Sequence, residues 1–355
     1  MATKEFNPSR HIIPDDATIL DALRMLNSIE DGVMTLLAET PDRHLTGTIT
    51  DGDIRRALLR GASPADPVRA AANKACRFVT PDIPVEELKA ARLHGIKLLP
   101  AVDSEGKLVK LIDLTRTETV LPLSAILMAG GKGERLRPLT LERPKPLLEI
   151  EGMPIIDYNI LNLARVGISD VTVTTRYLAS QIRDHFARPV CGIEVKCVEE
   201  TSPLGTIGAV SLVERPDDGD TLVMNSDLLT TLSLEEMFIL HKTEKADVTI
   251  AAVPYTVSVP YAILATDGRC VTALEEKPTY SHYANAGIYI FSNRLLNTVA
   301  KDTRTDAPDL IQKAIDEGLK VVYFPIDGLW IDIGSPADFR HAQELMRHHR
   351  ALGRF

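Results

Sequence analysis

The sequence has few cysteines, few aromatic side chains and no long apolar run. Its 355 residues include four cysteines and one tryptophan, and aromatic residues make up 5% of the chain. Four cysteines in a chain of this length do not form the disulfide framework of a small secreted domain. No apolar stretch approaches the roughly 20 residues that a membrane-spanning helix needs, and the first residues lack the apolar core of a signal peptide. We therefore expect a reduced, cytoplasmic protein with no membrane partner.

Basic residues do not outnumber acidic residues in this sequence. Lys plus Arg number 40 against 49 for Asp plus Glu, which gives a formal net charge of −9. Because a protein that binds nucleic acid carries a basic surface, we expect no nucleic-acid partner. Hydrophobic residues at 45% and charged residues at 25% are ordinary values for a globular protein. At roughly 150 residues per domain, the length predicts two or three domains.

A break at residues 117–123 separates two regions with different patterns. Before it lies a faint repeat, because LTGTITDGD begins at Leu45 and LVKLIDLTR at Leu108, each after a helical pattern and a strand-like run. Two such copies can share a core. After the break, the buried strand SAILMA opens an alternation of strands and helices, which indicates βαβ units and a mostly parallel sheet.

The expected elements after SAILMA are as follows. Strands are predicted at 170–174, 193–198, 222–225, 248–253, 261–265, 271–275 and 287–291, and helices at 178–186, 206–214, 234–241, 307–317 and 337–347. Residues 347–355 are predicted to be a frayed C-terminal tail.

A glycine-rich loop directly after SAILMA is the strongest chemical signal. Gly130, Gly131 and Gly133 can bring backbone N–H groups close to a phosphate, because glycine has no side chain and tolerates positive φ. Arg135 and Lys145 add the positive charge that phosphate oxygens attract. The loop contains no GxxxxGK[ST] and no GxGxxG, which excludes a P-loop and argues against a nicotinamide dehydrogenase. For GGKG alone, a glycine turn among solvated charges is the alternative.

Two aspartates are candidates for a metal site. Asp227 lies just past a strand, in MNSDLL, where open α/β sheets bind ligands. Asp332 is a lone carboxylate in LWIDIG, and burying it without a partner would be costly. Mg²⁺ takes one or two carboxylates from a protein, so the pair is a candidate Mg²⁺ site. On its own, an aspartate at position 227 is more often a cap or turn residue.

Further motifs follow in EEKP and NAGIY. Glu276 and Lys277 stand at the end of a predicted strand, a place from which they could bind a polar, anionic substrate. Asn285 opens NAGIY. Each has an equally weighted structural alternative when taken alone, so the argument depends on the order of the motifs along the chain.

That order resembles the sugar-phosphate nucleotidyltransferase (NDP-sugar pyrophosphorylase) family. The matching motifs are AGGKGERLRPLT…PKP, ETSPLGTIGAV, MNSDLL, EEKP, NAGIY and WIDIG, within residues 124–346. The resemblance implies a Rossmann-like α/β domain and the reaction of an NTP with a sugar 1-phosphate, giving an NDP-sugar and pyrophosphate for glycan biosynthesis. GTP is favoured, because PLGTIGA is similar to the PLGTAGA loop of guanylyltransferases that use mannose 1-phosphate or related sugars. A CBS-domain pair ahead of such a domain also resembles the guanylyltransferases that act on glucosamine 1-phosphate.

The resemblance also assigns roles by position. It implies that the nucleotide contacts Leu127, Ala129, Gly130, Gly131, Gly133 and Gly205; that Arg135, Lys145 and Asp227 are catalytic; that Asp227 and Asp332 bind Mg²⁺; and that Glu276, Lys277 and Asn285 bind the sugar phosphate. Ser226 departs from the family pattern, which usually has glycine before the metal-binding aspartate, and it could tighten the sugar or base pocket.

Residues 1–119 resemble a tandem CBS-domain pair, an α+β module. GTITDGD fits the family's adenosine-ligand pattern, which implies that Thr50 lies near phosphate and Asp53 binds the ribose of an adenine nucleotide. The second copy has Lys110, Asp113 and Arg116 at the equivalent places, which puts a second nucleotide site in doubt. A purely structural or oligomer-forming module is the alternative. Because such pairs commonly associate, we expect a homo-oligomer.

A second function hypothesis is a nucleotide-sensing regulatory protein whose transferase domain binds ligand without turnover. Family members of that kind tend to lose the Arg and Lys of the glycine-rich loop. Both Arg135 and Lys145 are present here, which favours the enzyme.

Overall fold

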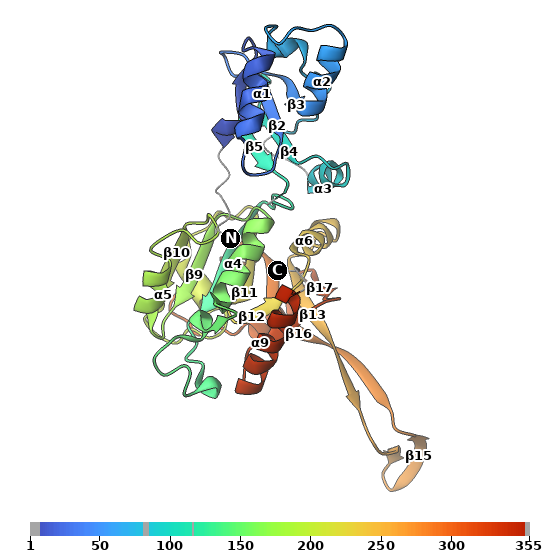
Figure 1. Ribbon diagram of the computed structural model, residues 1–355. Helices are drawn as coiled ribbons and strands as arrows, with labels where there is room; N and C mark the ends of the chain where they lie inside the picture. The colour runs from blue at the N-terminus through green and yellow to red at the C-terminus, as the bar shows by residue number, and fades with distance from the viewer. Residues whose placement is uncertain (1–7, 81–84, 116, 352–355) are drawn as a thin grey trace. The chain divides into compact units, whose positions relative to one another are not determined.

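The computed structural model describes residues 8–80, 85–115 and 117–351, which form two compact units. The first unit spans residues 1–120 with 165–167, and the second spans 121–164 with 168–355 (Figure 1). None of the helices in the described ranges is both long and apolar enough to cross a membrane.

The first unit repeats a helix–strand–strand pattern. Its elements are η1 (Pro8–His11), β1 (Ile12–Pro14), α1 (Ile19–Ser28), β2 (Thr35–Glu39), β3 (Leu45–Thr50), α2 (Asp51–Leu59), η2 (Val68–Ala70), α3 (Val85–Leu93), β4 (Leu98–Val102) and β5 (Leu108–Asp113). The order α1–β2–β3 recurs as α3–β4–β5, and each β pair is antiparallel. Leu37 of the first copy packs with Leu98 and Leu111 of the second, so the two copies share apolar contacts.

The second unit is built on a seven-stranded sheet. Its strands are β6 (Leu123–Ala129), β9 (Val171–Thr175), β10 (Val195–Glu199), β11 (Asp220–Asn225), β13 (Val248–Ser258), β16 (Thr279–Ser292) and β17 (Val321–Pro325), in the spatial order β10-β9-β6-β11-β16-β13-β17. Only β16 runs antiparallel to its neighbours among these strands. The prediction of a mostly parallel α/β sheet is therefore confirmed.

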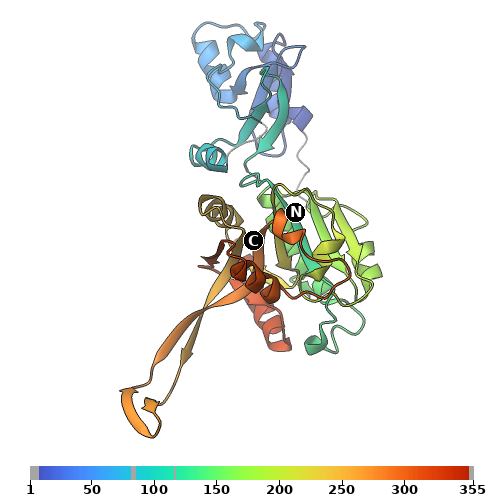
Figure 2. The same ribbon diagram turned by 180° about the vertical axis from the view of Figure 1, so that it is seen from behind.

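Helices cover both faces of this sheet (Figures 1 and 2). They are α4 (Ile155–Arg165), α5 (Ala179–His185), α6 (Leu234–Thr243), α7 (Asn293–Leu296), α8 (Ala307–Asp316) and α9 (Pro336–Ala351), with the 3₁₀ turns η3 (Glu134–Leu136), η4 (Lys145–Leu147) and η5 (Gly208–Leu212). Because both faces are buried, β6 and β9 read as nearly continuous apolar or β-branched runs. One core cluster joins Val223 and Phe291 of the sheet to Leu310 of α8.

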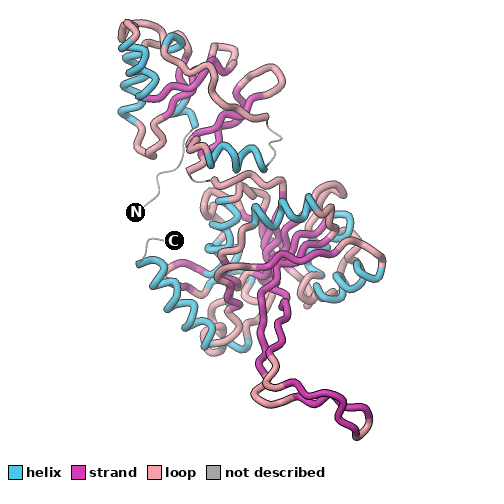
Figure 3. The backbone as a smooth tube through the Cα atoms, turned by 90° about the vertical axis from the view of Figure 1, so that its right-hand side faces the viewer, coloured by secondary structure: helices cyan, strands magenta, loops and turns pink. Residues whose placement is uncertain are grey.

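Three small antiparallel pairs complete the unit. They are β7 (Glu149–Ile150) with β8 (Met153–Pro154), β12 (Leu228–Thr230) with β18 (Trp330–Asp332), and β14 (Ile263–Asp267) with β15 (Cys270–Glu275). The β14–β15 pair forms the tip of an arm, in which β13 and β16 continue past the sheet as a two-stranded ribbon (Figure 3).

Four sequence predictions differ from the structure. The helix predicted at 206–214 is only the short turn η5, because the backbone of Gly208 is held against residues 303–305. The strands predicted at 248–253 and 287–291 are longer, because they extend into the arm. Within the predicted tail 347–355, residues 347–351 instead continue α9, and residues 352–355 lie outside the described residues.

Candidate functional site

A cleft of about 600 Å³ lies at one edge of the seven-stranded sheet. Parallel strands end at the same edge, and the residues that follow β6, β9, β10 and β11 all line this cleft. The lining includes Ala129, Gly130, Gly131, Gly133, Arg135, Lys145, Gly205 and Asp227, which the sequence had singled out, and also Arg176, Glu200, Asn225 and Arg304, which it had not.

The glycine-rich loop is shaped by two close approaches. Gly133 has a φ of +59°, and a Cβ there would lie 3.0 Å from Thr140 Cγ2, so both conformation and space favour glycine. At Gly130 a Cβ would overlap Glu200 Oε1. Gly131 has open space where a side chain would stand, which leaves its backbone accessible to a ligand.

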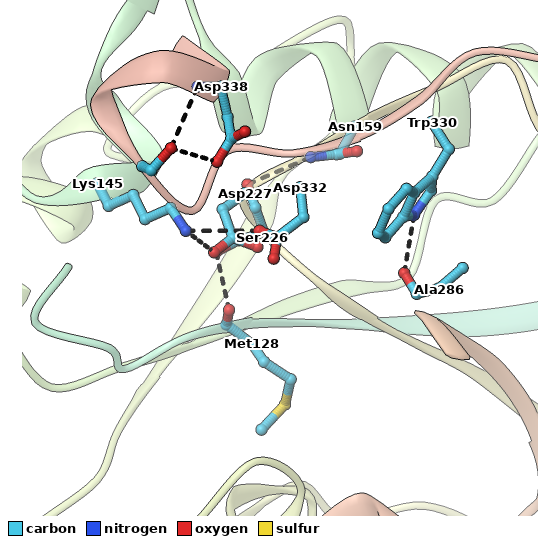
Figure 4. Close-up of polar contacts among 10 residues, drawn as sticks. Met128, Lys145, Asn159, Ser226, Asp227, Ala286, Trp330, Asp332 and Asp338 are labelled. Carbon is cyan, nitrogen blue, oxygen red and sulfur yellow. Dashed lines mark hydrogen bonds and ion pairs between the residues drawn. The ribbon is translucent and has the colours of Figure 1, made fainter. Parts of the chain in front are cut away.

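Lys145 and Asp227 line the cleft and form a charged cluster with Asp332, which lies beside them (Figure 4). Lys145, on η4, is 9% exposed and forms an ion pair with Asp227. Its Nζ also lies 3.7 Å from Asp332 Oδ1. The pairing of β12 with β18 brings the two aspartates together, because the Ile333 N–H donates to the Asp227 carbonyl oxygen at 3.2 Å. The structure thus unites three residues that are far apart in the sequence.

The two carboxylates fit a divalent cation. Asp227 Oδ1 is buried and has no hydrogen-bond partner among the described residues. Burial, followed by the charge of Asp227, raises the pKa of Asp332, while Lys145 and Arg135 act in the opposite direction. No group of three or more His, Cys, Asp or Glu side chains suited to a metal occurs in the described part of the chain. A two-carboxylate site suits Mg²⁺, which completes its shell with water and phosphate oxygens.

Guanidinium groups surround this centre. Arg135 on η3 lies against Gly334, where a Cβ would come within 3.1 Å of Arg135 Nη2, so the glycine after β18 leaves room for the arginine. Arg176 follows β9, and Arg304 precedes α8 and pairs with Asp306 at 3.4 Å. Planar guanidinium forks match phosphate oxygens, so the cleft is suited to a polyphosphate.

Glu200 is a buried carboxylate to which the sequence gave no role, although it is the first residue of the motif ETSPLGTIGAV. It follows β10, is 6% exposed, and accepts a hydrogen bond from the Leu204 N–H at 3.4 Å. Burial raises its pKa, against the lowering effects of that hydrogen bond and of Arg176. The alternation of side chains along a strand could have indicated its burial, because adjacent residues point to opposite sides. Glu199 is exposed and pairs with Arg183, so Glu200 points inward.

Comparison with known proteins agrees with this geometry. Residues 124–349 match the family model described as nucleotidyl transferase. The chain belongs to the nucleotidyl transferase family. It is 31% identical over 230 residues to the D-glycero-alpha-D-manno-heptose 1-phosphate guanylyltransferase of Aneurinibacillus thermoaerophilus, covering 64% of this chain and 100% of that protein. It is also 31% identical over 235 residues to the mannose-1-phosphate guanylyltransferase of Mycobacterium tuberculosis, covering 63% and 65%.

The mannose-1-phosphate relatives are matched over only part of their length, from 61% to 67%. A solved structure named as a glucose-1-phosphate thymidylyltransferase from Bacillus anthracis aligns with a TM-score of 0.52 at 21% identity, over 63% of this chain and 95% of that one. This likeness supports the Rossmann-like fold of the nucleotidyl transferase domain.

Five residues that the resemblance assigned to ligands do not line the cleft, and one of them is Asp332, which nevertheless lies beside Lys145. Leu127 of β6 is fully buried in the sheet, and its neighbour Met128 lines the cleft instead. Glu276 and Lys277 lie exposed on the arm. Asn285, on β16, accepts a hydrogen bond from the Gly287 N–H at 2.9 Å. In this nucleotidyl transferase chain, the residues predicted to hold the sugar phosphate therefore stand outside the described pocket.

Ser226, the departure from the family pattern, is accommodated by a local hydrogen bond. Its side chain is buried, and its hydroxyl donates to the Met128 carbonyl oxygen at 2.8 Å (Figure 4). The Asn159 side chain donates to the Ser226 carbonyl oxygen at 3.3 Å. The hydroxyl is therefore fixed against β6.

In the first unit, Thr50 and Asp53 cap a helix. The Asp53 N–H donates to Thr50 Oγ1 at 3.3 Å, and Asp53 Oδ2 accepts from the Thr50 N–H at 2.9 Å, which is a capping box at the start of α2. Thr18 and Asp21 form the same arrangement on α1. In the second copy, Asp113 caps a turn by accepting from the Thr115 N–H, and Arg116 lies outside the described residues.

We predict that Glu200→Gln raises the melting temperature of the protein at pH 7.5. The folded state holds the Glu200 proton more tightly than the unfolded state, because burial raises the pKa of this carboxyl. Wild-type stability therefore increases as the pH falls through that raised pKa, whereas the glutamine does not titrate. The difference in melting temperature should be largest above the raised pKa and should shrink as the pH falls. Glu199→Gln, at the exposed neighbour, is the control and should show no such gain. A pH-independent difference for Glu200→Gln would contradict the prediction.

Proposed function

We propose that the second unit transfers a nucleotidyl group from an NTP to a sugar 1-phosphate, producing an NDP-sugar and pyrophosphate for glycan biosynthesis. The observation that carries the proposal is the cluster of Lys145, Asp227 and Asp332 beside a glycine-rich loop at the carboxyl edge of the sheet. Membership of the nucleotidyl transferase family supports it.

The chemistry requires charge neutralisation more than proton transfer. An oxygen of the sugar phosphate attacks the α-phosphorus of the NTP. The bond from that phosphorus to the oxygen that bridges it to the β-phosphorus breaks, and pyrophosphate leaves with the electron pair. A phosphate monoester is already anionic near neutral pH, so no strong general base is needed. Lys145 and Arg135 line the cleft, and in this proposal they reduce repulsion between the two anions and stabilise the leaving group.

Magnesium is part of this proposal. Asp227 and Asp332 would hold the ion, and Asp227 Oδ1 is a buried oxygen that such a cation would satisfy. When bound, Mg²⁺ would neutralise phosphate charge and orient the triphosphate.

GTP is the proposed nucleotide, and Glu200 supports the choice. Guanine presents two neighbouring donors, N1–H and N2–H₂, on its Watson–Crick edge, whereas an ionised carboxylate only accepts hydrogen bonds. Glu200 lines the same cleft as Gly130 and Gly205 and places its oxygens against the glycine-rich loop. Adenine, uracil, thymine and cytosine offer no such pair of adjacent donors, so a buried acceptor at this place favours guanine.

The direct test is pyrophosphate release from each NTP with a panel of sugar 1-phosphates, with Mg²⁺ or with excess EDTA. We expect release with GTP and one sugar 1-phosphate, and no release in EDTA. Arg135→Ala should lower the rate by about 10²-fold, in line with the loss of one charge-stabilising group.

Arg137→Ala is the matched control, because Arg137 belongs to the same loop and is exposed like Arg135 but does not line the cleft. Near-wild-type turnover of Arg135→Ala would contradict its assigned role. An absence of release across the whole panel, with nucleotide binding intact, would favour the nucleotide-sensing alternative.

The role of Glu200 is tested by comparing GTP with ITP, which lacks the N2 amino group. We expect wild type to prefer GTP by roughly 10- to 100-fold in kcat/KM, as for one hydrogen bond to a charged group. Glu200→Gln should reduce that preference and Glu199→Gln should retain it. If Glu200→Gln kept the full preference for GTP, the carboxylate would not be the group that recognises the N2 amine.

For the first unit, we propose binding of an adenine nucleotide at the CBS-like motif, with Thr50 and Asp53 as contacts. The motif itself supports this, although both side chains also cap α2. Regulation requires that the nucleotide bind two states of the enzyme differently. We therefore expect AMP, ADP, ATP or a cyclic nucleotide to change the kinetics of pyrophosphate release. Unchanged kinetics with all of them would favour the purely structural alternative for this unit.

A further inference from the structure

The arm of the second unit has a well-defined root. Beyond the sheet, β13 and β16 remain paired from Pro254 opposite Tyr283 to Ser258 opposite Thr279. Tyr283 stacks on Tyr323 of the edge strand β17, with ring centroids 4.7 Å apart, which fixes the base of the arm against the sheet. Because β16 is antiparallel to β11, the arm leaves the sheet at the same carboxyl edge that carries the cleft.

The ribbon of the arm has one apolar face and one hydroxyl-bearing face. Val257 stands directly opposite Tyr280, and Tyr255, two residues before Val257, stands opposite His282, so the mainly apolar face carries these four side chains. The opposite face consists of Thr256, Ser258, Thr279 and Ser281. Such alternation is typical of a sheet with one buried face. Yet Tyr255, Val257 and Tyr280 are 59%, 41% and 36% exposed.

The tip continues this exposure of apolar side chains. Leu264 and Leu274 stand opposite each other on β14 and β15 and are 51% and 62% exposed. Val271 is 57% exposed, and Tyr261, between ribbon and tip, is 76% exposed. Two-stranded ribbons are marginally stable in water without packing on an apolar face, and exposed apolar patches mark interaction sites. The arm therefore has the character of a surface that is covered by a partner.

The exposed area is sufficient for a protein interface. With about 200 Å² for each tyrosine and about 100 Å² for each aliphatic side chain, the exposed parts of these seven residues provide roughly 550 Å² of apolar surface. A standard interface buries about 800 Å² per partner, of which about 60% is apolar. One arm thus supplies the apolar share of one side of an interface.

Charge and symmetry select a second copy of the chain as the partner. Residues 255–284 contain three acidic and two basic side chains, in a chain whose formal charge is −9. The arm is therefore nearly neutral. Two arms can approach each other without the electrostatic repulsion that acts between the acidic remainders of the two chains. A two-fold contact places one patch against the identical patch of the other copy, so the same tyrosines and leucines meet from both sides.

We propose that two copies of this chain form a dimer through the apolar faces of their arms. This proposal goes beyond the transferase function and does not rest on it. In this proposal the arm, rather than the CBS-like unit, forms the contact of the expected homo-oligomer.

The test measures the mass of the full-length chain by size-exclusion chromatography with light scattering, from about 1 to 100 μM. The arm variant is Val257→Glu with Leu274→Glu. Both positions are exposed in the single chain, so the substitutions should leave folding intact, which circular dichroism checks. We expect wild type to be dimeric and the arm variant to be monomeric, or to have a dissociation constant raised at least 10-fold.

Two controls separate the arm face from surface charge in general. Thr256→Glu adds one negative charge, against two in the arm variant, next to Val257 on the hydroxyl-bearing face of the ribbon. Ile315→Glu replaces an apolar side chain that is 50% exposed on α8. Both should remain dimeric. A wild type that is monomeric up to 100 μM would overturn the proposal, as would an arm variant that stays dimeric, which would assign assembly to another surface such as the first unit. Pyrophosphate release, measured on the same samples, tests the transferase function separately.

Discussion

A single buried ammonium group facing two carboxylates organises the cleft of the second unit. Lys145 pairs with Asp227 and lies 3.7 Å from Asp332, and burial makes the charge of the lysine costly without these partners. Removing one member would leave its partner uncompensated, which is more destabilising than losing an exposed ion pair. The geometry depends on packing beneath it: Leu229 of β12 and Ile331 of β18 belong to one apolar cluster with Met346 of α9. The final helix thus helps to hold a charged centre whose lysine lies some 200 residues earlier in the chain.

The reversed strand β16 explains two features of the same sheet. It pairs with β11, which carries the cleft residues at its end, and with β13, which runs beside it into the arm. Gly287 of β16 has a φ of +74° and stands where a Cβ would contact the side chain of Asn225. The strand therefore passes close to the cleft before it extends outward. Trp330 adds a further tie, because its indole N–H donates to the Ala286 carbonyl oxygen at 2.9 Å (Figure 4).

Carboxylates have three different roles in this molecule because their surroundings differ. Asp53 completes a helix cap in the first unit, where two donors from Thr50 satisfy one oxygen. Asp227 forms an ion pair with Lys145. Its Oδ1 is nevertheless buried without a hydrogen-bond partner among the described residues, which suits a cation. Glu200 has a raised pKa and faces a glycine-rich loop, which suits a ligand that donates hydrogen bonds. The residue type alone does not distinguish these roles.

The sequence by itself determined the class of fold, the family and much of the cleft. A buried strand followed by glycines, and strands alternating with helices, sufficed because period and turn chemistry are local properties. Tertiary structure alone decided the inward position of Glu200, the joining of Asp227 to Asp332 through β12 and β18, and the placement of Glu276 and Lys277 on the arm. The length of β13 and β16 was also beyond the sequence, since Pro254 reads as a strand end and yet lies within the ladder. These features come from pairings between residues far apart in the chain, and such pairings are set by burial and register, which a local pattern does not contain.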